Sequence, residues 1–432
     1  MTMRHKAAEA KKASIQLAAV PTNIKNNALK AIAVALEKKK DQIISANQTD
    51  LKNAARDTLA APLLKRLKFQ KDKIKDAIEG ISSVIGLEDP VGVTASAMEL
   101  DKDLELFKVS SPIGLIGIVF ESRPDALVQI SSLCLKSGNA VIMKGGSEAA
   151  STNRILADII SEAGISAGIP VGWLTLIEAR SDVADMLSMD KFIDLIIPRG
   201  SNAFVRYIMD NTNIPVLGHA DGICHVYIDK LADIEMAINI SVDSKCQYVA
   251  VCNAAETLLV HKDIAPEILP TLKTALEKKG VEIRGCGNTL KIIDVKAATE
   301  EDWRTEYLDL IISVKIVATL DDAVNHINTF GSGHTDVIVT EDKTRGIKFM
   351  DYVDSADVFL NCSSRFADGF RYGLGAEVGI STNKIHARGP VGLEGLMIYK
   401  WRLMGNGHVV SDYAGTNAKT FTHRPLDKTF NK

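Results

Sequence analysis

The sequence predicts an α/β protein built on two parallel sheets. From about residue 113 to residue 360, short runs rich in Val, Ile and Leu alternate with longer amphipathic stretches. This alternation is typical of strand–helix–strand units. A break at Pro215, Gly218 and Gly222 separates two such units. The chain has 432 residues, more than one hydrophobic core usually supports, so two or three domains are expected.

The first unit follows a helical region at residues 7–85, where Ala, Lys, Glu and Leu dominate. Its predicted strands and helices alternate as 113–120, 140–143, 148–162, 173–177, 181–189, 192–197 and 201–211. The second unit is predicted to alternate in the same way through 223–228, 235–242, 257–260, 268–278, 310–317, 323–330, 337–339 and 358–360. After residue 363 the composition favours loops, and 396–403 is then predicted to be an exposed strand that pairs with another subunit.

Bulk composition excludes several classes of function. The net charge is −3, from 51 basic and 54 acidic residues, so no basic excess favours nucleic acid or an anionic membrane. The first residues lack the apolar core of a secretory signal, and the run at 113–120 is too short to cross a bilayer. The six cysteines form no CxxC pair, which favours free thiols in a cytoplasmic protein and argues against a metal site.

Cys252 lies just before the apolar run Thr257–Val260. A thiol on a loop before a buried strand can be held rigidly and still face a cleft, as a nucleophile requires. The alternative is a small core residue, because a free cysteine also packs as a buried hydrophobe.

Two glycine-containing turns follow predicted strands of the first unit. One is Lys144-Gly145-Gly146-Ser147, and the other is Pro198-Arg199-Gly200-Ser201, with Ser201 placed to cap a helix. The carboxyl ends of parallel strands meet at one edge of the sheet, where glycines and helix N-termini suit an anionic ligand. Ordinary turns with surface side chains are the alternative.

Two further stretches carry candidate binding residues. Arg123 follows the most apolar strand and could bind a phosphate or a carboxylate with two hydrogen bonds. The backbone of Ser332-Gly333-His334 could form an anion-binding nest. Both also fit plain surface loops.

With these features together, the chain resembles the aldehyde dehydrogenase superfamily and, within it, the γ-glutamyl phosphate reductases (glutamate-5-semialdehyde dehydrogenases). The segments that carry the resemblance are IGLIGIVFESRPDAL (113–127), VIMKGGSEA (141–149), DLIIPRGS (194–201), CNAAETLLVH (252–261), EYLDLIISVKIV (306–317), HINTFGSGHTDVIVT (326–340) and GLGAEVGIST (373–382). Two departures from that family are Phe330, where a histidine or tyrosine is usual, and the segment CQYVAVC before the nucleophile.

The resemblance implies a three-part fold and a reaction. An NADP-binding domain would comprise 1–98 and 111–220, a catalytic domain 221–388, and a bridging β-element for oligomers 99–110 and 393–412. The reaction would be NADPH-dependent reduction of L-glutamate 5-phosphate to L-glutamate 5-semialdehyde and phosphate, the second step of proline biosynthesis from glutamate. Cys252 would form a thioester, with Asn253 and nearby backbone amides meeting the oxyanion.

The resemblance also assigns binding residues. Lys144 would hold the adenosine ribose, Glu306 the nicotinamide ribose, and Ser147 would tolerate the 2′-phosphate of NADP. Ser122 stands where the superfamily has an oxyanion asparagine. Together with Arg123, Ser332, Gly333 and His334 it would contact the substrate.

Hydrolytic relatives carry a glutamate that activates water, and the matching stretch here, Val216 to Gly222, has none. A thioester meant for reduction has to be protected from water, which favours acyl-phosphate chemistry. The rivals are another acylating enzyme, for example one using coenzyme A, and a non-catalytic protein that retains the fold. The expected partners are a small-molecule substrate, further copies of the chain and, because the substrate is labile, a glutamate kinase.

Overall fold

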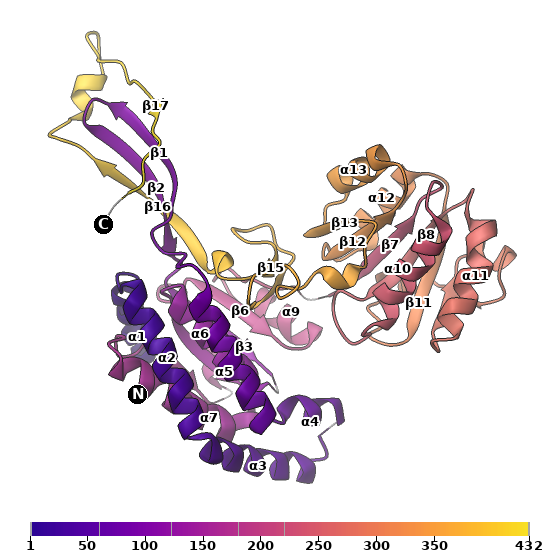
Figure 1. The fold of residues 1–432 in the computed structure, drawn as a ribbon, viewed down its shortest axis with the longest axis horizontal. Coiled ribbons are helices and arrows are strands. Elements are labelled where there is room, and N and C mark those ends of the chain that lie inside the picture. The colour runs from indigo at the N-terminus through magenta and orange to yellow at the C-terminus, as the bar shows by residue number, and fades with distance from the viewer. Residues whose placement is uncertain (1, 60, 122, 180, 220, 431–432) are drawn as a thin grey trace.

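The chain is described by a computed structural model covering residues 2–59, 61–121, 123–179, 181–219 and 221–430. Two parallel sheets with their helices lie side by side, and a four-stranded antiparallel sheet projects away from both (Figure 1). No helix in the described part of the chain is long and apolar enough to cross a membrane.

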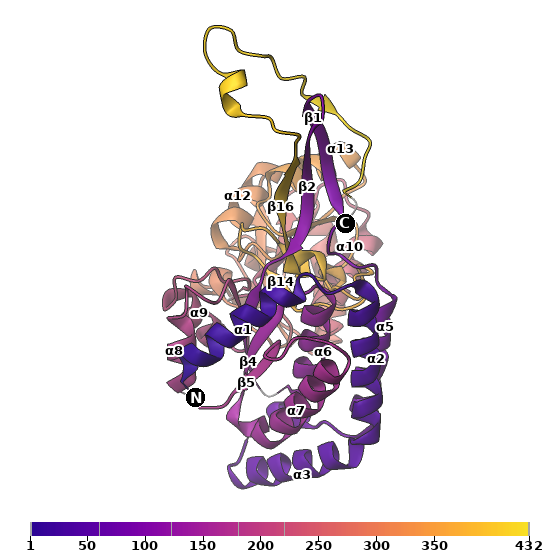
Figure 2. The ribbon, with the colours of Figure 1, turned by 90° about the vertical axis from the view of Figure 1, so that its left-hand side faces the viewer.

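The N-terminal region is helical, as the sequence predicts. The helices are α1 (Met3–Leu17), α2 (Thr22–Lys38), α3 (Lys40–Arg56), α4 (Ala61–Leu67) and α5 (Lys71–Gly86). Helix α2 buries Ala28, Leu29, Ile32 and Leu36, whose spacing of three and four residues forms one apolar face. It packs beside α5 on one flank of the first unit (Figure 2).

The first sheet has the strand order β5-β4-β3-β6 and is parallel throughout. Its strands are β3 (Leu115–Phe120), β4 (Ala140–Gly145), β5 (Leu174–Ile177) and β6 (Leu195–Arg199). Its helices are α6 (Pro124–Lys136), α7 (Ala150–Ser166), α8 (Ser181–Leu187) and α9 (Asn202–Asp210). Because β4 and β6 lie on opposite sides of β3, the strand order reverses there. In open α/β sheets, ligands bind at the carboxyl ends of the strands beside such a point.

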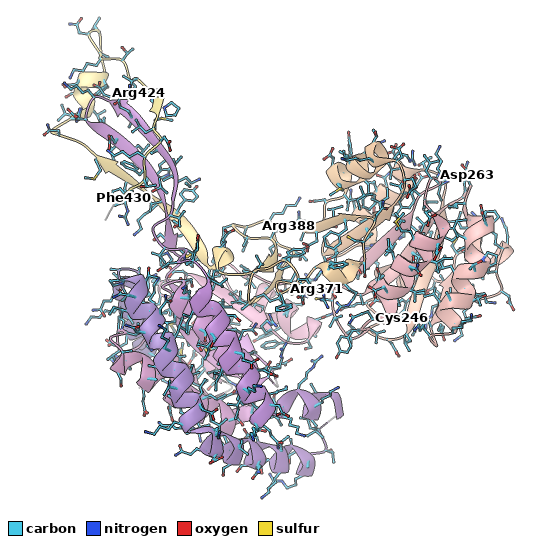
Figure 3. All side chains as sticks on the ribbon, viewed as in Figure 1. Cys246, Asp263, Arg371, Arg388, Arg424 and Phe430 are labelled. Carbon is cyan, nitrogen blue, oxygen red and sulfur yellow. The ribbon has the colours of Figure 1, made fainter. Side chains whose placement is uncertain are left out.

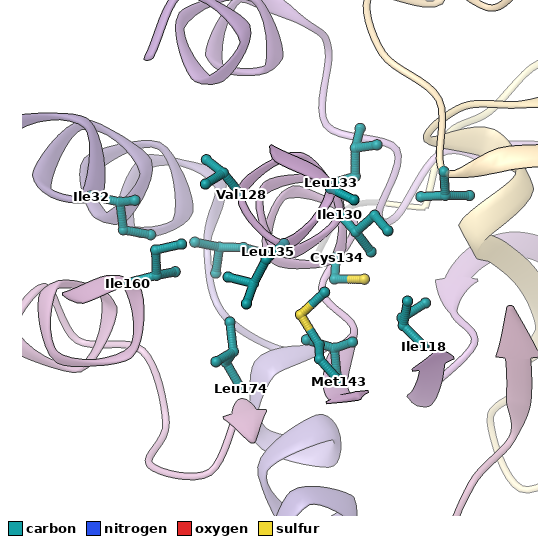
Figure 4. Close-up of a cluster of buried hydrophobic side chains, with 14 of the residues drawn as sticks. Ile32, Ile118, Val128, Ile130, Leu133, Cys134, Leu135, Met143, Ile160 and Leu174 are labelled. Carbon is teal, nitrogen blue, oxygen red and sulfur yellow. The ribbon is translucent and has the colours of Figure 1, made fainter. Parts of the chain in front are cut away.

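The core beneath α6 shows how a cysteine behaves as a hydrophobe. Cys134 is fully buried and packs among Ile130, Met143, Leu135 and Ile118 (Figure 4). Burial raises the pKa of the Cys134 thiol to about 12. This thiol therefore stays protonated and inert, in contrast to the nucleophile predicted at position 252.

The second sheet is parallel and has the order β10-β9-β11-β8-β7-β12-β13. Its strands are β7 (Cys224–Ile228), β8 (Ala255–His261), β9 (Glu282–Gly285), β10 (Lys296–Ala297), β11 (Ile311–Val317), β12 (Thr335–Val339) and β13 (Asp357–Leu360). The helices are α10 (Ile234–Cys246), α11 (Ala265–Glu277), α12 (Leu320–Phe330) and α13 (Lys343–Tyr352). The sequence prediction lacks β9, β10 and α13. Strands β9 and β10 are short and carry charged residues, and α13 buries only Gly346 and Phe349.

The antiparallel sheet has the order β16-β2-β1-β17. Its strands are β1 (Thr94–Asp101), β2 (Leu104–Pro112), β16 (Met397–Met404) and β17 (Arg424–Pro425). It includes most of the residues 99–110 and part of 393–412, and it also takes in 94–98 and 424–425. Phe430 packs edge-on against Phe107 and holds the C-terminal segment on this sheet (Figure 3).

Candidate active site

Cys252 lies in the turn that immediately precedes β8, as the sequence predicts, and its side chain is half-buried. All seven residues of β8 are buried, so the turn stands on a rigid strand. The thiol of the neighbouring Cys224 donates a hydrogen bond to the Cys252 carbonyl over 3.1 Å. The backbone of the predicted nucleophile is therefore held by strand β8, which follows it, and by the Cys224 thiol.

Gly222 packs directly against this turn. A β-carbon at position 222 would collide with the backbone and the β-carbon of Cys252. Only glycine permits this approach of two backbone segments. The loop before β7 is thereby pressed against the loop before β8.

Two histidines converge on the thiol. One ring nitrogen of His219, one ring nitrogen of His334 and the Cys252 sulfur all lie within 4.8 Å of one another. His219 donates from Nδ1 to the carbonyl of Ile380 over 2.9 Å, in β14 (Gly379–Ser381), so its Nε2 carries a lone pair. Burial lowers the pKa of His219, which keeps this imidazole neutral.

His334 is fully buried and sits just before β12. Its Nδ1 lies 2.7 Å from the Thr335 hydroxyl, and its Nε2 has no hydrogen-bond partner among the described residues. The His219 and His334 rings meet edge to face with centroids 4.9 Å apart. The sequence prediction included His334 and missed His219. The one indication for His219 was that it lies in the stretch 216–222, which matches the glutamate-containing stretch of hydrolytic relatives.

Two arginines provide positive charge at the thiol. Arg199 and Arg365 both lie near enough to Cys252 for their charges to act on its side chain. Arg199 donates to the Val378 carbonyl over 2.6 Å, and Arg365, buried in the loop after β13, donates from Nε to Gln247 over 2.9 Å. The sequence predicted Arg199 as a cofactor residue, and that role stays a prediction, whereas Arg365 was missed.

Of the two residues predicted to bind the substrate after β3, one can be placed. Ser122 lies outside the described residues. Arg123 donates to Asp125 over 3.0 Å, and its side chain is 41% exposed. Its charge also interacts with Arg199, so Arg123 adds to the positive field around the crevice.

Asn253 makes a structural contact, and its expected oxyanion role stays a prediction. Its side-chain amide donates to the Ala367 carbonyl over 2.8 Å, and its own carbonyl accepts from the Ser364 hydroxyl over 2.6 Å. With its donor engaged in this way, Asn253 joins the nucleophile turn to the segment that carries Arg365. The backbone amides near Cys252 remain the predicted oxyanion donors.

Ser332 and Gly333 shape the loop that carries His334. The Ser332 hydroxyl accepts a hydrogen bond from the Ile223 amide over 2.9 Å. Gly333 has a φ of +70°, a left-handed conformation that suits glycine, and its carbonyl accepts from Ala356 over 2.9 Å. Both residues therefore position His334, and substrate contact through this loop stays a prediction.

Glu306 links the two units at the site. It accepts hydrogen bonds from the side-chain amide of Asn202 and from the backbone of Gly222. Burial raises the pKa of its carboxyl. The predicted nicotinamide-side residue thus lies against the same glycine that contacts Cys252.

A buried ion pair supports the floor of the site. Lys245 and Glu256 are both fully buried, with 2.6 Å between the ammonium nitrogen and a carboxylate oxygen. The second oxygen of Glu256 accepts from the Leu308 amide over 3.4 Å, just after Glu306. The pair therefore fixes both the strand under Cys252 and the segment that carries Glu306.

The two glycine turns of the first unit lie at the carboxyl ends of β4 and β6, on either side of β3. Lys144 is 8% exposed and donates to the Gly145 carbonyl over 2.5 Å. A β-carbon at Gly145 would collide with Asn153, a buried amide whose polar atoms have no partner among the described residues. An unpartnered amide beside a glycine turn fits a polar ligand such as a dinucleotide at this edge.

At the second turn, Pro198 lies one residue before the end of β6 and pairs with Val119 of β3. Ser201 occupies the cap position of α9, but its side chain makes no capping bond. Its amide instead donates to Glu121 over 3.0 Å. A side chain at Gly200 would press on the same carboxylate. The sequence placed the turn and the cap residue Ser201 correctly, and cofactor binding at this turn stays a prediction.

Two parallel α/β sheets, the Cys252 thiol before a buried strand and the two glycine turns at strand ends are together typical of an oxidoreductase fold. Cys252 is its predicted nucleophile. The chain matches the sequence profile of the aldehyde dehydrogenase family over residues 2–284. The chain therefore belongs to the aldehyde dehydrogenase family.

Comparison with individual proteins shows which members of the family this chain is similar to. A gamma-glutamyl phosphate reductase of Acetivibrio thermocellus is 64% identical over 430 residues, covering all of both chains. The crystal structure of gamma-glutamyl phosphate reductase from Thermotoga maritima is 41% identical with a TM-score of 0.92, over 94% of this chain and 99% of that one. An acetylating aldehyde dehydrogenase from Geobacillus thermoglucosidasius is 16% identical with a TM-score of 0.63, over 94% and 97%, and shares the fold alone.

Proposed function

We propose that this chain reduces L-glutamate 5-phosphate to L-glutamate 5-semialdehyde and phosphate with NADPH, in proline biosynthesis. The observation that carries the proposal is the full-length identity of 64% to a gamma-glutamyl phosphate reductase, together with Cys252 placed among cations and imidazoles. The reacting form of a cysteine nucleophile is the thiolate, so basic neighbours such as imidazoles are the groups that this chemistry needs.

In the proposed first step, Nε2 of His219 accepts the Cys252 proton and the sulfur attacks the acyl-phosphate carbonyl. The carbon–oxygen bond to phosphate breaks, and a thioester remains on Cys252. Arg199 and Arg365 interact electrostatically with the thiol, and they stabilise the thiolate before attack and the anionic substrate during it.

When bound, NADPH supplies the hydride that reduces the thioester carbonyl. The resulting oxyanion on the carbon attached to Cys252 re-forms the carbonyl and expels the thiolate as the aldehyde leaves. In this proposal, backbone amides of the turn before β8 would donate hydrogen bonds to that charge. The buried pair beneath the turn and Gly222 above it hold the sulfur in position throughout.

The cofactor would be held by the residues of the two glycine turns and by Glu306. They are Lys144, Gly145, Gly146, Ser147, Pro198, Arg199, Gly200, Ser201 and Glu306. Ser147 carries no charge to repel a 2′-phosphate, which supports NADPH over NADH. In this proposal the first unit (1–98 and 111–220) binds the cofactor and the second (221–388) carries the thiol.

An assembly of identical chains belongs to the same proposal. Strand β16 forms one edge of the antiparallel sheet, and Ile398, Tyr399, Trp401 and Leu403 on it are exposed. An exposed apolar edge strand invites pairing with another chain. Light scattering of purified protein, with and without Trp401→Glu, tests whether this strand joins subunits. Contact with a glutamate kinase is tested by co-purification.

The reverse reaction tests the activity, because the forward substrate is labile. Purified protein is given L-glutamate 5-semialdehyde, NADP and inorganic phosphate, and NADPH formation is followed by absorbance. We expect a rate that depends on phosphate. A rate that requires coenzyme A, or one that needs no acceptor except water, would overturn the proposal.

A further inference from the structure

The cluster around the nucleophile offers three ligands of a kind that zinc prefers. The Cys252 sulfur, one His219 nitrogen and one His334 nitrogen lie within 4.8 Å of one another. They come from three segments: the loop before β7, the turn before β8 and the residue before β12. We propose that His219, Cys252 and His334 together bind a zinc ion that reversibly blocks the nucleophile.

The two imidazoles are already oriented for this role. The bond from His219 Nδ1 to the Ile380 carbonyl fixes that ring and leaves Nε2 with a lone pair. Metal-bound histidines usually hold their other ring nitrogen in this way, on a carbonyl or a carboxylate. His334 pairs its Nδ1 with the Thr335 hydroxyl, which can accept from it and so complete the same arrangement.

His334 supplies a second, independent observation. Its side chain is fully buried, and Nε2 has no hydrogen-bond partner among the described residues. A buried polar atom without a partner is unfavourable, and a bound cation would satisfy it. One ring nitrogen of His334 lies within 4.8 Å of the Cys252 sulfur, and Nε2 is the nitrogen left free to bind a metal.

The donor set selects the metal. Zinc binds thiolate and imidazole, whereas magnesium and calcium prefer oxygen. With Zn–S near 2.3 Å and Zn–N near 2.0 Å, tetrahedral donors lie about 3.5 Å apart. Small side-chain rotations that move the three ligand atoms by roughly 1 Å would therefore let them bind one ion. Three protein ligands leave a fourth position for water or for a phosphate oxygen.

The consequence is inhibition. A sulfur that shares its electron pair with zinc cannot attack the acyl carbonyl, and the ion occupies the space that the substrate needs. The inhibition is reversible because no covalent bond forms, so a chelator would restore the thiol. The inferred inhibition of Cys252 by zinc rests on the proposed function. The inferred binding of zinc does not depend on it.

Binding is measured on the full-length reduced protein after metal removal. Zinc is titrated in competition with a chromogenic indicator, and cobalt(II) is titrated separately because cobalt bound to a thiolate gives a charge-transfer absorption band. We expect one metal per chain. Cys252→Ser should abolish the cobalt band, and His219→Gln and His334→Gln should each weaken zinc binding by about tenfold or more.

The matched controls replace a cysteine and a histidine that lie outside the cluster of His219, Cys252 and His334. Cys286→Ser and His5→Gln remove a half-buried thiol and an exposed imidazole and should leave the affinity unchanged. A cobalt band that survives Cys252→Ser, or a His219→Gln protein that binds zinc as the parent does, would overturn the site. If the buried His334→Gln variant does not fold, as judged by circular dichroism, the half-buried His219→Gln decides.

The inhibition is tested in the reverse assay. Zinc should abolish NADPH formation and a chelator should restore it fully. A protein that binds zinc through these residues but lacks phosphate-dependent activity would contradict the proposed function and leave the metal site standing. An active protein that zinc does not inhibit would contradict the inferred block.

Discussion

The thiol site and the cofactor-side turn are built in different ways. The turn Lys144–Ser147 is contiguous, and its lysine, two glycines and helix start follow one strand. The environment of Cys252 combines Arg199, His219, His334 and Arg365, which come from well-separated parts of the chain. A contiguous site can be recognised from local sequence, whereas one assembled by tertiary contacts cannot.

The thiol site also rests on a buried ion pair. The second unit places Lys245 and Glu256 together under the nucleophile and pairs His225 with Asp336 over 2.8 Å, all fully buried. Burying a charge is costly unless it is paired, so removing one partner destabilises the fold. Substitutions on the thiol side should therefore affect both activity and stability, and substitutions at the cofactor turn should mainly alter cofactor choice.

The largest expected effect is on turnover. Cys252→Ser should lower the rate of the reverse reaction by about 10³-fold or more, because a hydroxyl at this position is a far weaker nucleophile. Initial rates with NADP and phosphate measure it. Cys286→Ser is the control and should keep its rate, since its thiol bonds to Thr289. Near-normal turnover of Cys252→Ser would remove the thiol from the mechanism.

The next effect separates activity from stability. Lys245→Met leaves Glu256 buried without its partner, so the free energy of unfolding should fall by about 3 kcal/mol. Urea denaturation followed by circular dichroism measures this change. Lys273→Met breaks the pair with Glu277, which is more than half exposed, and should cost less than about 1 kcal/mol. Equal losses in both variants would show that the buried pair has no special role.

A buried histidine predicts how acid weakens the second unit. Burial lowers the pKa of His326 from 6.5 to about 2. Below pH 6.5 the unfolded chain therefore binds a proton that the folded chain does not. The free energy of unfolding should fall with decreasing pH, by up to about 1.4 kcal/mol per unit from this group. His326→Gln should flatten that slope in urea denaturation between pH 6.5 and about 5. The exposed His5→Gln should not, and an unchanged slope in His326→Gln would refute the assignment.

The smallest expected effect concerns the cofactor turn. Ser147→Glu adds a carboxylate where the 2′-phosphate is proposed to lie, so the preference for NADPH over NADH should fall by about tenfold through charge repulsion. Ratios of kcat/KM for the two cofactors measure it. Ser188→Glu places the same charge at an exposed residue of the same unit and should leave the ratio unchanged. A ratio unaltered by Ser147→Glu would move the phosphate site elsewhere.

Sequence alone determined the alternating architecture, the exposed strand β16 and the position of Cys252 before a buried strand. These are local matters, because hydrophobic periodicity and turn residues reflect the element in which they stand. The same reasoning missed β9 and α13, where few side chains are buried and the apolar pattern is weak.

Only the tertiary structure decided what surrounds the thiol. His219 looked like one residue of a glycine-rich loop until Ile380 fixed its ring and Gly222 brought that loop to Cys252. Arg199 and Asn253 gained partners that the sequence did not indicate. The Arg199 guanidinium donates to the Val378 carbonyl, and the Asn253 side-chain amide donates to the Ala367 carbonyl. Which donor a buried group finds depends on segments distant in sequence, and no local pattern encodes that choice.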